Sequence, residues 1–156
     1  MQSILYVDDE RENLIVFETI FRKFYHVLTA LSVAEAKAIL ETREIDLLLT
    51  DQKMPNESGT QLLIFAAQHY PSIERILITG YTELDTIVEA VNQAKVFYYV
   101  TKPWDPKELR IIIERALEVR ALRMENQKLI LELKESNKKL LEKNIYLAEA
   151  SEEIDH

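Results

Sequence analysis

The sequence of 156 residues contains no cysteine, two glycines, four prolines and a single tryptophan. The absence of cysteine excludes disulfide bonds and thiolate metal sites, and it favours a reducing compartment such as the cytoplasm. No apolar run approaches the length of a membrane span, and no signal-peptide pattern opens the chain. We therefore expect a cytoplasmic protein with no membrane contact.

Positive charge is also in short supply. The chain carries 27 acidic residues against 19 Lys and Arg, which gives a formal net charge of -8. This balance argues against direct binding of nucleic acid, because phosphate backbones are bound by clustered basic residues. It suits metal cations or basic partner surfaces instead. The hydrophobic content of 47% is typical of a globular domain, and the length allows one domain and an appendage.

Short apolar runs alternate with amphipathic stretches over the first three quarters of the sequence. The runs predict five strands, at residues 4–7, 26–29, 45–50, 76–79 and 96–100. Helices are predicted at residues 13–24, at 32–42, from Gly59 to about 69, and from Asp105 onward. The second of these begins with a capping box of Ser32 and Glu35. A further helix is predicted from an apolar stripe of Leu84, Ile87, Val88 and Val91. This alternation predicts an α/β fold, a doubly wound parallel sheet with helices on both faces.

Polar residues follow four of these strands where each strand ends. Asp8 and Asp9 follow the first strand, Asp51 the third, Thr79 closes the fourth, and Lys102 follows the fifth. In open parallel sheets the carboxyl ends of the strands form the ligand-binding edge. Three carboxylates at one edge repel each other unless a cation lies between them, and an all-oxygen set suits Mg²⁺. An aspartate beside Mg²⁺ and a lysine can act as a nucleophile toward phosphorus.

These residues resemble a known family, the receiver domain of bacterial two-component response regulators. The resemblance covers roughly residues 1–120 and rests on motifs that each follow their own strand. They are the acidic pair Asp8-Asp9, the stretch Asp51-x-x-Met54-Pro55-x-x-Ser58-Gly59, the pair Thr79-Gly80, the ring of Tyr99, and Lys102-Pro103. The resemblance implies a flavodoxin-like sheet with strand order 2-1-3-4-5, and a cis peptide bond between Lys102 and Pro103.

The resemblance also implies a role for each site residue. Asp51 is the expected phosphoacceptor, and Lys102 is expected to pair with the phosphoryl group. Thr79 and Tyr99 form the expected switch pair, in which the hydroxyl moves toward the phosphate and the aromatic ring turns inward. The expected ligands of Mg²⁺ are Asp8, Asp9, Asp51 and the backbone carbonyl of Lys53.

Three residues depart from the usual pattern of the family. Glu57 stands where an apolar residue is more common, which predicts a more exposed loop. Lys53 and Tyr81 lie two residues after Asp51 and Thr79, where water must approach to hydrolyse an acyl phosphate. We hypothesise that Lys53 and Tyr81 tune the rate of dephosphorylation. Glu10, the third carboxylate of the opening run, is expected only to cap the first helix.

The last 50 residues contain neither proline nor glycine after Pro106, and they predict a helix that continues as a coiled coil over residues 121–156. One heptad register places Val, Asn, Leu, Leu, Leu and Ile at positions 119, 126, 133, 140, 147 and 154, with Leu122 and Leu129 between them. A second register places the leucines from 133 at d, with Asn137 and Asn144 at a. The first register is imperfect at Ser136 and Lys143, and we favour it from Val119 to Leu133. The register of the remaining residues, and a stutter between the two, are left open. Because a solitary helix of this kind is marginal in water, we expect a homodimer, or a linker helix to an output domain.

The first functional hypothesis is a signalling module that is not an enzyme beyond its own phosphorylation and autodephosphorylation. A sensor histidine kinase or phosphotransfer protein would phosphorylate Asp51, and the fourth helix, fifth strand and fifth helix would relay the change. The alternatives are a Mg²⁺-dependent phosphohydrolase with an aspartate nucleophile and a scaffold that is never phosphorylated. A flavin-binding module is disfavoured, because Asp8-Asp9-Glu10 would repel the flavin phosphate. The sequence does not identify the cognate kinase, the signal or the output.

Overall fold

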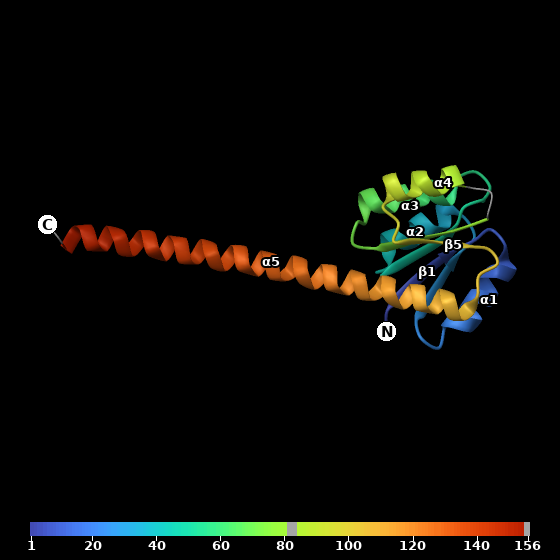
Figure 1. Ribbon diagram of the computed structural model, residues 1–156, viewed down its shortest axis with the longest axis horizontal. Helices are drawn as coiled ribbons and strands as arrows, with labels where there is room; N and C mark the ends of the chain where they lie inside the picture. The colour runs from blue at the N-terminus through green and yellow to red at the C-terminus, as the bar shows by residue number, and fades with distance from the viewer. Residues whose placement is uncertain (81–83, 155–156) are drawn as a thin grey trace. The chain divides into compact units, whose positions relative to one another are not determined.

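The computed structural model describes residues 1–80 and 84–154 as five strands alternating with helices (Figure 1). The strands are β1 (Ser3–Val7), β2 (His26–Ala30), β3 (Leu47–Asp51), β4 (Glu74–Thr79) and β5 (Tyr98–Thr101). The helices are α1 (Arg11–Phe21), α2 (Val33–Thr42), α3 (Gly59–His69), α4 (Leu84–Glu89), the π-helix η1 (Ala90–Ala94) and α5 (Pro106–Ile154). All strand pairs are parallel, and their order is β2-β1-β3-β4-β5, which confirms the expected topology.

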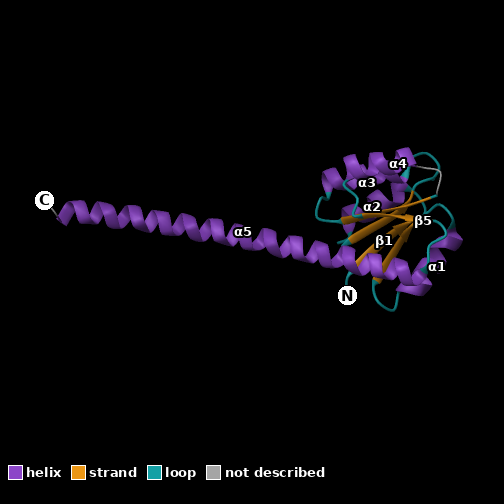
Figure 2. Cartoon of the chain, in the orientation of Figure 1, coloured by secondary structure: helices purple, strands orange, loops and turns teal. Residues whose placement is uncertain are grey.

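The sheet lies between two helical layers, each with its own apolar core (Figure 2). Successive side chains of a strand point to opposite faces. Leu5 and Val7 of β1 therefore pack with α2, α3, α4 and η1, whereas Ile4 and Tyr6 pack with α1 and α5. Since both faces are covered, β3 and β4 are buried along their whole length. This double burial fixes the strand ends, on which the site is built.

Polar caps begin the helices α2, α3 and α5. The side chain of Ser32 accepts a hydrogen bond from the backbone N–H of Glu35, as predicted, while the Glu35 carboxylate accepts from Leu31, one residue before the cap. The full reciprocal capping box lies at Ser58 and Gln61 instead, at the start of α3. At α5 the Asp105 carboxylate accepts from the backbone N–H of Glu108, which confirms the predicted cap.

The structure corrects the predicted stripe on the fourth helix. Val88 and Val91 are exposed, and the buried side chains are Ile87, Ala90 and Ala94. The buried residues Ile87, Ala90 and Ala94 keep helical spacing, so the buried face passes through two small alanines that the predicted stripe did not include. The π-helix η1 begins at Ala90, after the exposed Val88. Leu84, the first residue of the predicted stripe, has no described side chain.

Several predicted boundaries also shift. The first helix ends at Phe21 rather than at residue 24, and a turn leads from there to β2. The third strand begins at Leu47 and includes Asp51 as its last residue. The fifth begins at Tyr98 rather than at residue 96. The apolar residues at 45 and 96–97 lie beside the sheet rather than in it, so composition alone extended both strands too far.

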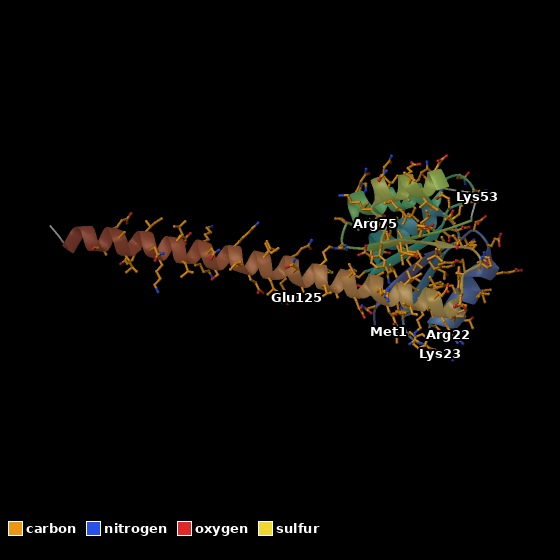
Figure 3. All side chains as sticks on the ribbon, in the orientation of Figure 1. Met1, Arg22, Lys23, Lys53, Arg75 and Glu125 are labelled. Atoms are coloured by element: carbon orange, nitrogen blue, oxygen red, sulfur yellow. The ribbon has the colours of Figure 1, made fainter. Side chains whose placement is uncertain are left out.

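The end of η1 is held by the buried guanidinium of Arg75, which is labelled in Figure 3. Its Nε donates to the carbonyl of Ala94 at 2.7 Å, and its Nη1 donates to the carbonyl of Ile73 at 2.6 Å. Beyond these, Lys95 adopts a left-handed backbone conformation with φ of 50°. A side chain of β4 thus satisfies carbonyl groups that a helix end leaves without intrahelical partners.

The chain forms two compact units, Met1–Arg120 and Ala121–His156, and α5 contributes to both. Within the first unit, Leu109, Ile113, Ala116 and Leu117 of α5 are buried against the sheet. In the second unit the described side chains of the helix are almost all exposed. No helix in the described residues combines the length and the apolar character that a membrane span requires.

Arg120, the last residue of the first unit, ties α5 to the amino ends of the strands. Its Nη1 lies 2.9 Å from the Asp46 carboxylate, and its Nε donates to the carbonyl of Ser72 at 2.9 Å. Asp46 in turn accepts from the backbone N–H of Ser3 at 2.7 Å. One guanidinium thereby links α5 to the starts of β1, β3 and β4.

We expect Arg120→Ala to lower the free energy of unfolding of the first unit by about 1–2 kcal/mol, because it removes a partly buried ion pair and a charged hydrogen bond. Urea denaturation followed by circular dichroism measures the change. Arg115→Ala, an exposed arginine one turn earlier, serves as the control. Equal effects of the two substitutions would contradict the structural role of the Arg120 ion pair.

Candidate functional site

The strand order brings the predicted site residues to one edge of the sheet. Asp8 and Asp9 directly follow β1, Asp51 ends the neighbouring β3, and Thr79 ends β4 beside it. One oxygen from each of Asp8, Asp9 and Asp51 can be chosen such that all three lie within 4.8 Å of one another. Asp8 and Asp51 are buried, whereas Asp9 is exposed. The three carboxylates therefore form one acidic cluster, as the sequence predicts.

Lys102 reaches this cluster from the end of β5. Its Nζ lies 3.0 Å from Oδ2 of Asp51 and 3.3 Å from Oδ2 of Asp8. The peptide bond between Lys102 and Pro103 is cis, which confirms the expectation from the family resemblance. The ammonium group thus lies opposite the acidic residues of two different strands, and it offsets part of their mutual repulsion.

The balance of burial and neighbouring charges raises the pKa values of both Asp51 and Lys102. Burial raises the pKa of Asp51 above its ordinary value; the hydrogen bond and charge of Lys102 oppose the rise but do not cancel it, and the charge of Asp8 adds to it. Burial on its own would lower the pKa of Lys102, but the hydrogen bond and charge of Asp51 outweigh this effect, so the pKa is raised. Lys102 therefore stays positively charged opposite the carboxylates.

Asp8 is held by four donors. Its Oδ1 accepts from the backbone N–H of Glu10 at 2.9 Å. Its Oδ2 accepts from the hydroxyl of Tyr6 at 3.3 Å, from Nδ2 of Asn13 at 3.1 Å and from Lys102. The Asn13 amide also donates to the Glu10 carboxylate, which makes no capping bond to a helix N–H. Glu10 thus occupies the N-cap position of α1, as predicted, but its side chain makes no capping hydrogen bond.

Tyr6 and Asn13 are site residues that the sequence reasoning did not single out. A signal for Tyr6 was available, because residues two apart on a strand share a face and a tyrosine two residues before a buried aspartate can donate to it. Asn13 had a weaker signal, since its contact with Asp8 depends on how α1 turns away from β1.

The loop after Asp51 depends on Gly59 for its close packing. A Cβ atom at Gly59 would lie 2.1 Å from the carbonyl oxygen of Asp51, so no larger residue fits without displacing the backbone of the acidic residue. The backbone N–H of Gly59 donates to the carbonyl of Gln52 at 3.0 Å. The start of α3 is thereby held directly against the end of β3.

The remaining predicted residues lie around this centre. The Thr79 side chain is buried, whereas Tyr99 is 40% exposed and its ring stacks on that of Tyr98 with centroids 5.6 Å apart. Lys53 is exposed and lines a shallow depression with Asp9 (Figure 3 labels Lys53). Glu57 is only partly exposed and lies 3.6 Å from the ammonium of Lys37. Tyr81 lies outside the described residues.

Comparison with known proteins agrees with this geometry. The family model described as "Response regulator receiver domain" matches residues 4–114. The chain belongs to the response regulator receiver domain family. Receiver domains are the signal-receiving parts of two-component systems, so this chain contains such a part.

Two relatives illustrate the family. The hydrogenase transcriptional regulatory protein HoxA of Cupriavidus necator is 34% identical over 134 residues, which cover 86% of this chain and 28% of that protein. The response regulator protein PilR of Pseudomonas aeruginosa is 36% identical over 120 residues, which cover 76% of this chain and 27% of that protein. The receiver chain therefore spans less than a third of the length of these relatives.

Solved structures show the same fold. The signal receiver domain of an HD domain-containing protein from Pseudomonas fluorescens Pf-5 matches with a TM-score of 0.75 and 33% identity, covering 77% of this chain and 97% of that one. A CheY-like receiver domain protein from Methanospirillum hungatei JF-1 matches with a TM-score of 0.75 and 31% identity, covering 79% and 98%.

We expect Asp51→Asn to raise the free energy of unfolding by about 1 kcal/mol in the presence of EDTA, which corresponds to roughly 3 °C in the unfolding midpoint. The raised pKa of Asp51 means that the folded state disfavours its ionised form, so stability falls as pH rises through the carboxyl range up to that pKa. The asparagine removes this cost at neutral pH. Differential scanning calorimetry measures the midpoint, with the exposed Asp85→Asn as the control. An unchanged or lower midpoint would contradict the charge repulsion inferred at the site.

Proposed function

We propose that this receiver accepts a phosphoryl group on Asp51 from a sensor histidine kinase or phosphotransfer protein, with Mg²⁺ as its cofactor. The observation that carries the proposal is the placement of Lys102 Nζ at 3.0 Å from Asp51, beside the cluster of Asp8, Asp9 and Asp51. Three carboxylates without nitrogen or sulfur ligands fit Mg²⁺. The backbone carbonyl of Lys53 is the proposed fourth protein ligand.

The proposed step is a transfer between two side chains. An oxygen of Asp51 forms a bond to phosphorus while the bond between phosphorus and the donor histidine nitrogen breaks, and the electron pair of that bond leaves with the imidazole. Lys102 pairs with the phosphoryl oxygens, and its positive charge is already 3.0 Å from the attacking carboxylate. When bound, Mg²⁺ supplies the charge neutralisation that the transferring group requires. The chain thus modifies itself and, in this proposal, turns over no other substrate.

The proposed relay runs through Thr79 and Tyr99. Thr79 ends β4 beside Asp51, where its hydroxyl can move toward a phosphoryl oxygen. The Tyr99 ring is exposed on β5, so it is free of the core and can turn inward as Thr79 moves. The proposed output face consists of exposed apolar residues on α4, η1, β5 and α5, namely Val88, Val91, Tyr98 and Ile111. A new charge at Asp51 that biases such a face is a sufficient switch.

Lys53 is proposed to tune how long the phosphorylated state lasts. It shares its depression with Asp9 at the mouth of the acidic cluster, from which water must reach the acyl phosphate. Tyr81 is proposed to act in the same way, because it lies two residues after Thr79 in the sequence.

Phosphorylation can be tested by incubating the protein with MgCl₂ and acetyl phosphate and measuring its intact mass. We expect a gain of one phosphoryl group, lost in Asp51→Asn and on addition of EDTA but retained in Asp85→Asn. Lys102→Ala is expected to slow the gain at least tenfold, since it removes the only cation beside Asp51 among the described residues. A wild-type chain that never gains mass would favour the scaffold hypothesis, and gain by Asp51→Asn would refute the assigned acceptor.

The second proposal is a homodimer through residues 121–156. Leu122, Leu129, Leu133, Leu140 and Leu147 are exposed on a single helix that nothing in the described chain covers. The first register accounts for residues 119–129, and the second, with Asn137 and Asn144 at a, for residues 130–154. The two join by a stutter, because the d positions 122 and 133 are eleven residues apart. Buried asparagines at a favour a parallel dimer. We propose that this dimer passes the change to an output domain, since the chain spans less than a third of a relative named as a transcriptional regulatory protein.

A matched pair of double variants tests the dimer. Leu133→Gln with Leu140→Gln removes two leucines that lie on the seam in both registers, whereas Leu131→Gln with Leu141→Gln removes two leucines of similar exposure that lie off it. We expect sedimentation velocity to show at least tenfold weaker self-association for the seam variant only, because each lost leucine empties a core position in both helices. A monomeric wild type, or equal loss in both variants, would contradict the seam.

A further inference from the structure

Tyr6 is a buried polar residue at the edge of the acidic cluster. It lies on β1 two residues before Asp8, so the two side chains share a face of the strand. The ring is fully buried, and the hydroxyl donates to Oδ2 of Asp8 at 3.3 Å. Burial and the neighbouring charge of Asp8 raise the pKa of Tyr6 well above its ordinary value, so the hydroxyl keeps its proton and acts as the donor.

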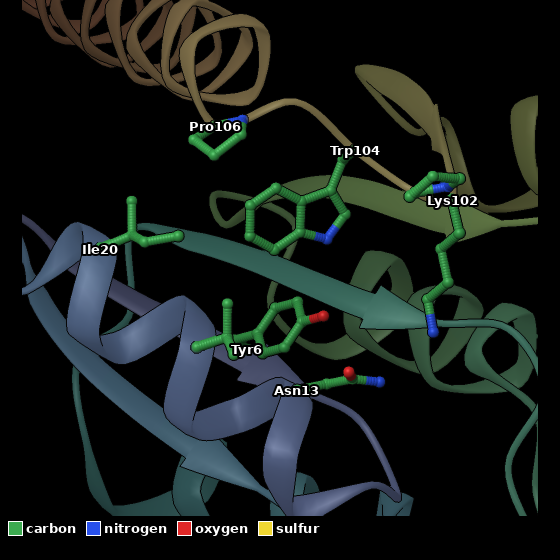
Figure 4. A pocket seen from close by; sticks show the side chains of 8 residues that line it. Tyr6, Asn13, Ile20, Lys102, Trp104 and Pro106 are labelled. Carbon is green, nitrogen blue, oxygen red and sulfur yellow. The ribbon is translucent and has the colours of Figure 1, made fainter.

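The Tyr6 ring is itself held in place by other aromatic side chains. It stacks on Phe17 of α1 with centroids 4.2 Å apart and an angle of 5° between the planes. Trp104 meets the same Phe17 edge-on at 6.2 Å and 83°. Trp104 and Tyr6 therefore contact the same Phe17 ring, and both line one cavity. Figure 4 shows the indole nitrogen on the side of Trp104 that faces the Tyr6 ring.

Trp104 follows Lys102 by two residues. The short segment after β5 therefore reaches Asp8 in two ways, directly through the ammonium of Lys102 at 3.3 Å and indirectly through Trp104, Phe17 and the Tyr6 hydroxyl. Any movement of this segment changes both connections together. The carboxylate of Asp8 is thus coupled to the loop that carries the ammonium group.

A cavity of about 440 Å³ opens beside this link. Tyr6 and Trp104 line it together with Asn13, Lys102 and apolar residues of α1 and of the loop, as Figure 4 shows. Trp104 therefore has open space on one side and is not confined by close packing. It packs against Phe17 and Phe21 of α1, with ring centroids 6.2 Å apart in both pairs.

We propose that Tyr6, held by Phe17 and Trp104, is a positioning residue that orients the Asp8 carboxylate for cation binding. Hydrogen-bond donors that fix a ligand carboxylate reduce the freedom it loses when a cation binds, and such partners contribute strongly to metal affinity. The inference deepens the function proposed above, because it assigns the support of one of the proposed Mg²⁺ ligands. The alternative is that the Tyr6 hydroxyl donates to Asp8 only because a buried donor needs an acceptor, with no effect on cation binding.

The substitution Tyr6→Phe separates the two readings, because it keeps the stacked ring and removes only the hydroxyl. Isothermal titration calorimetry with MgCl₂ measures the dissociation constant without any phosphorylation. We expect Tyr6→Phe to weaken Mg²⁺ binding about tenfold. Tyr25→Phe is the matched control, since Tyr25 is buried in the same core and has no hydrogen bond to the acidic cluster among those of the described residues; its affinity is expected to equal that of the wild type.

Trp104→Ala tests the second half of the link. It removes the ring that meets Phe17 edge-on, and we expect a weakening of Mg²⁺ binding of about threefold. The double variant with Tyr6→Phe should bind no more weakly than Tyr6→Phe alone, because Trp104 acts through the hydroxyl. If the losses of Mg²⁺ affinity in the two single variants add in the double variant, Trp104 does not act through Tyr6.

An unchanged Mg²⁺ affinity in Tyr6→Phe, in a wild type that binds Mg²⁺, overturns the positioning role even if the variant is less stable. A wild type that binds Mg²⁺ but is never phosphorylated would refute the proposed function and leave the positioning role intact. A wild type that does not bind Mg²⁺ would refute both. Thermal unfolding of every variant in EDTA separates loss of cation binding from loss of folding.

Discussion

The repulsion among Asp8, Asp9 and Asp51 is the constraint on which the rest of the site depends. Parallel strands in the order β2-β1-β3-β4-β5 bring the ends of β1 and β3 side by side, so the carboxylates converge because of the sheet itself. Two of the three are buried, and burial makes their charges more costly. The site is therefore stable only with positive charge beside it, and Lys102 supplies that charge from the end of β5.

The need to hold these charges explains features that otherwise look unrelated. Gly59 is required where the start of α3 meets the carbonyl of Asp51. Asn13 and Tyr6 donate hydrogen bonds to Asp8 on the face of the sheet that α1 covers. The same layer contains Phe17 and Trp104, so the apolar core between α1 and α5 also serves as the support of the acidic centre. The same face of β1 therefore contributes side chains both to the apolar core and to the support of the acidic cluster.

The two helical layers have different consequences for signalling. The layer of α1 and α5 contains large aromatic side chains close to Asp8, among them Phe17 and Phe21. On the other layer, α4 continues into a π-helix whose core side holds only Ala90 and Ala94 after Ile87, with its end held by Arg75. Small side chains leave fewer contacts to break, and a π-turn is a local departure from the regular helix. A face that must change its packing is better built on this second layer than on the first.

The strand pattern allowed the parallel sheet and the five residues at its strand ends to be predicted, because each of these residues ends or follows an apolar run. The order of the strands was predicted from the resemblance to the receiver family. Asp51 needed no knowledge of packing to be singled out. The stripe on α4 was predicted wrongly because the large apolar side chains were assigned to the core, whereas the small Ala90 and Ala94 face it. The capping box at Ser58 and Gln61 was missed, although these residues have the same spacing as Ser32 and Glu35. The boundaries of β3 and β5 failed for a similar reason, since apolar composition does not distinguish a strand residue from one beside the sheet.

What the sequence determined by itself was the kind of chemistry, since oxygen ligands, a lysine and a hydroxyl at successive strand ends are readable from residue type and order. Only the tertiary structure decided which groups support that chemistry. Tyr6, Asn13 and Trp104 reach Asp8 through contacts made by different segments, and these depend on how α1 and the loop after β5 pack against the sheet. Such contacts leave no period or spacing in the chain, because they arise from the angle and distance between elements rather than from the order of residues within one.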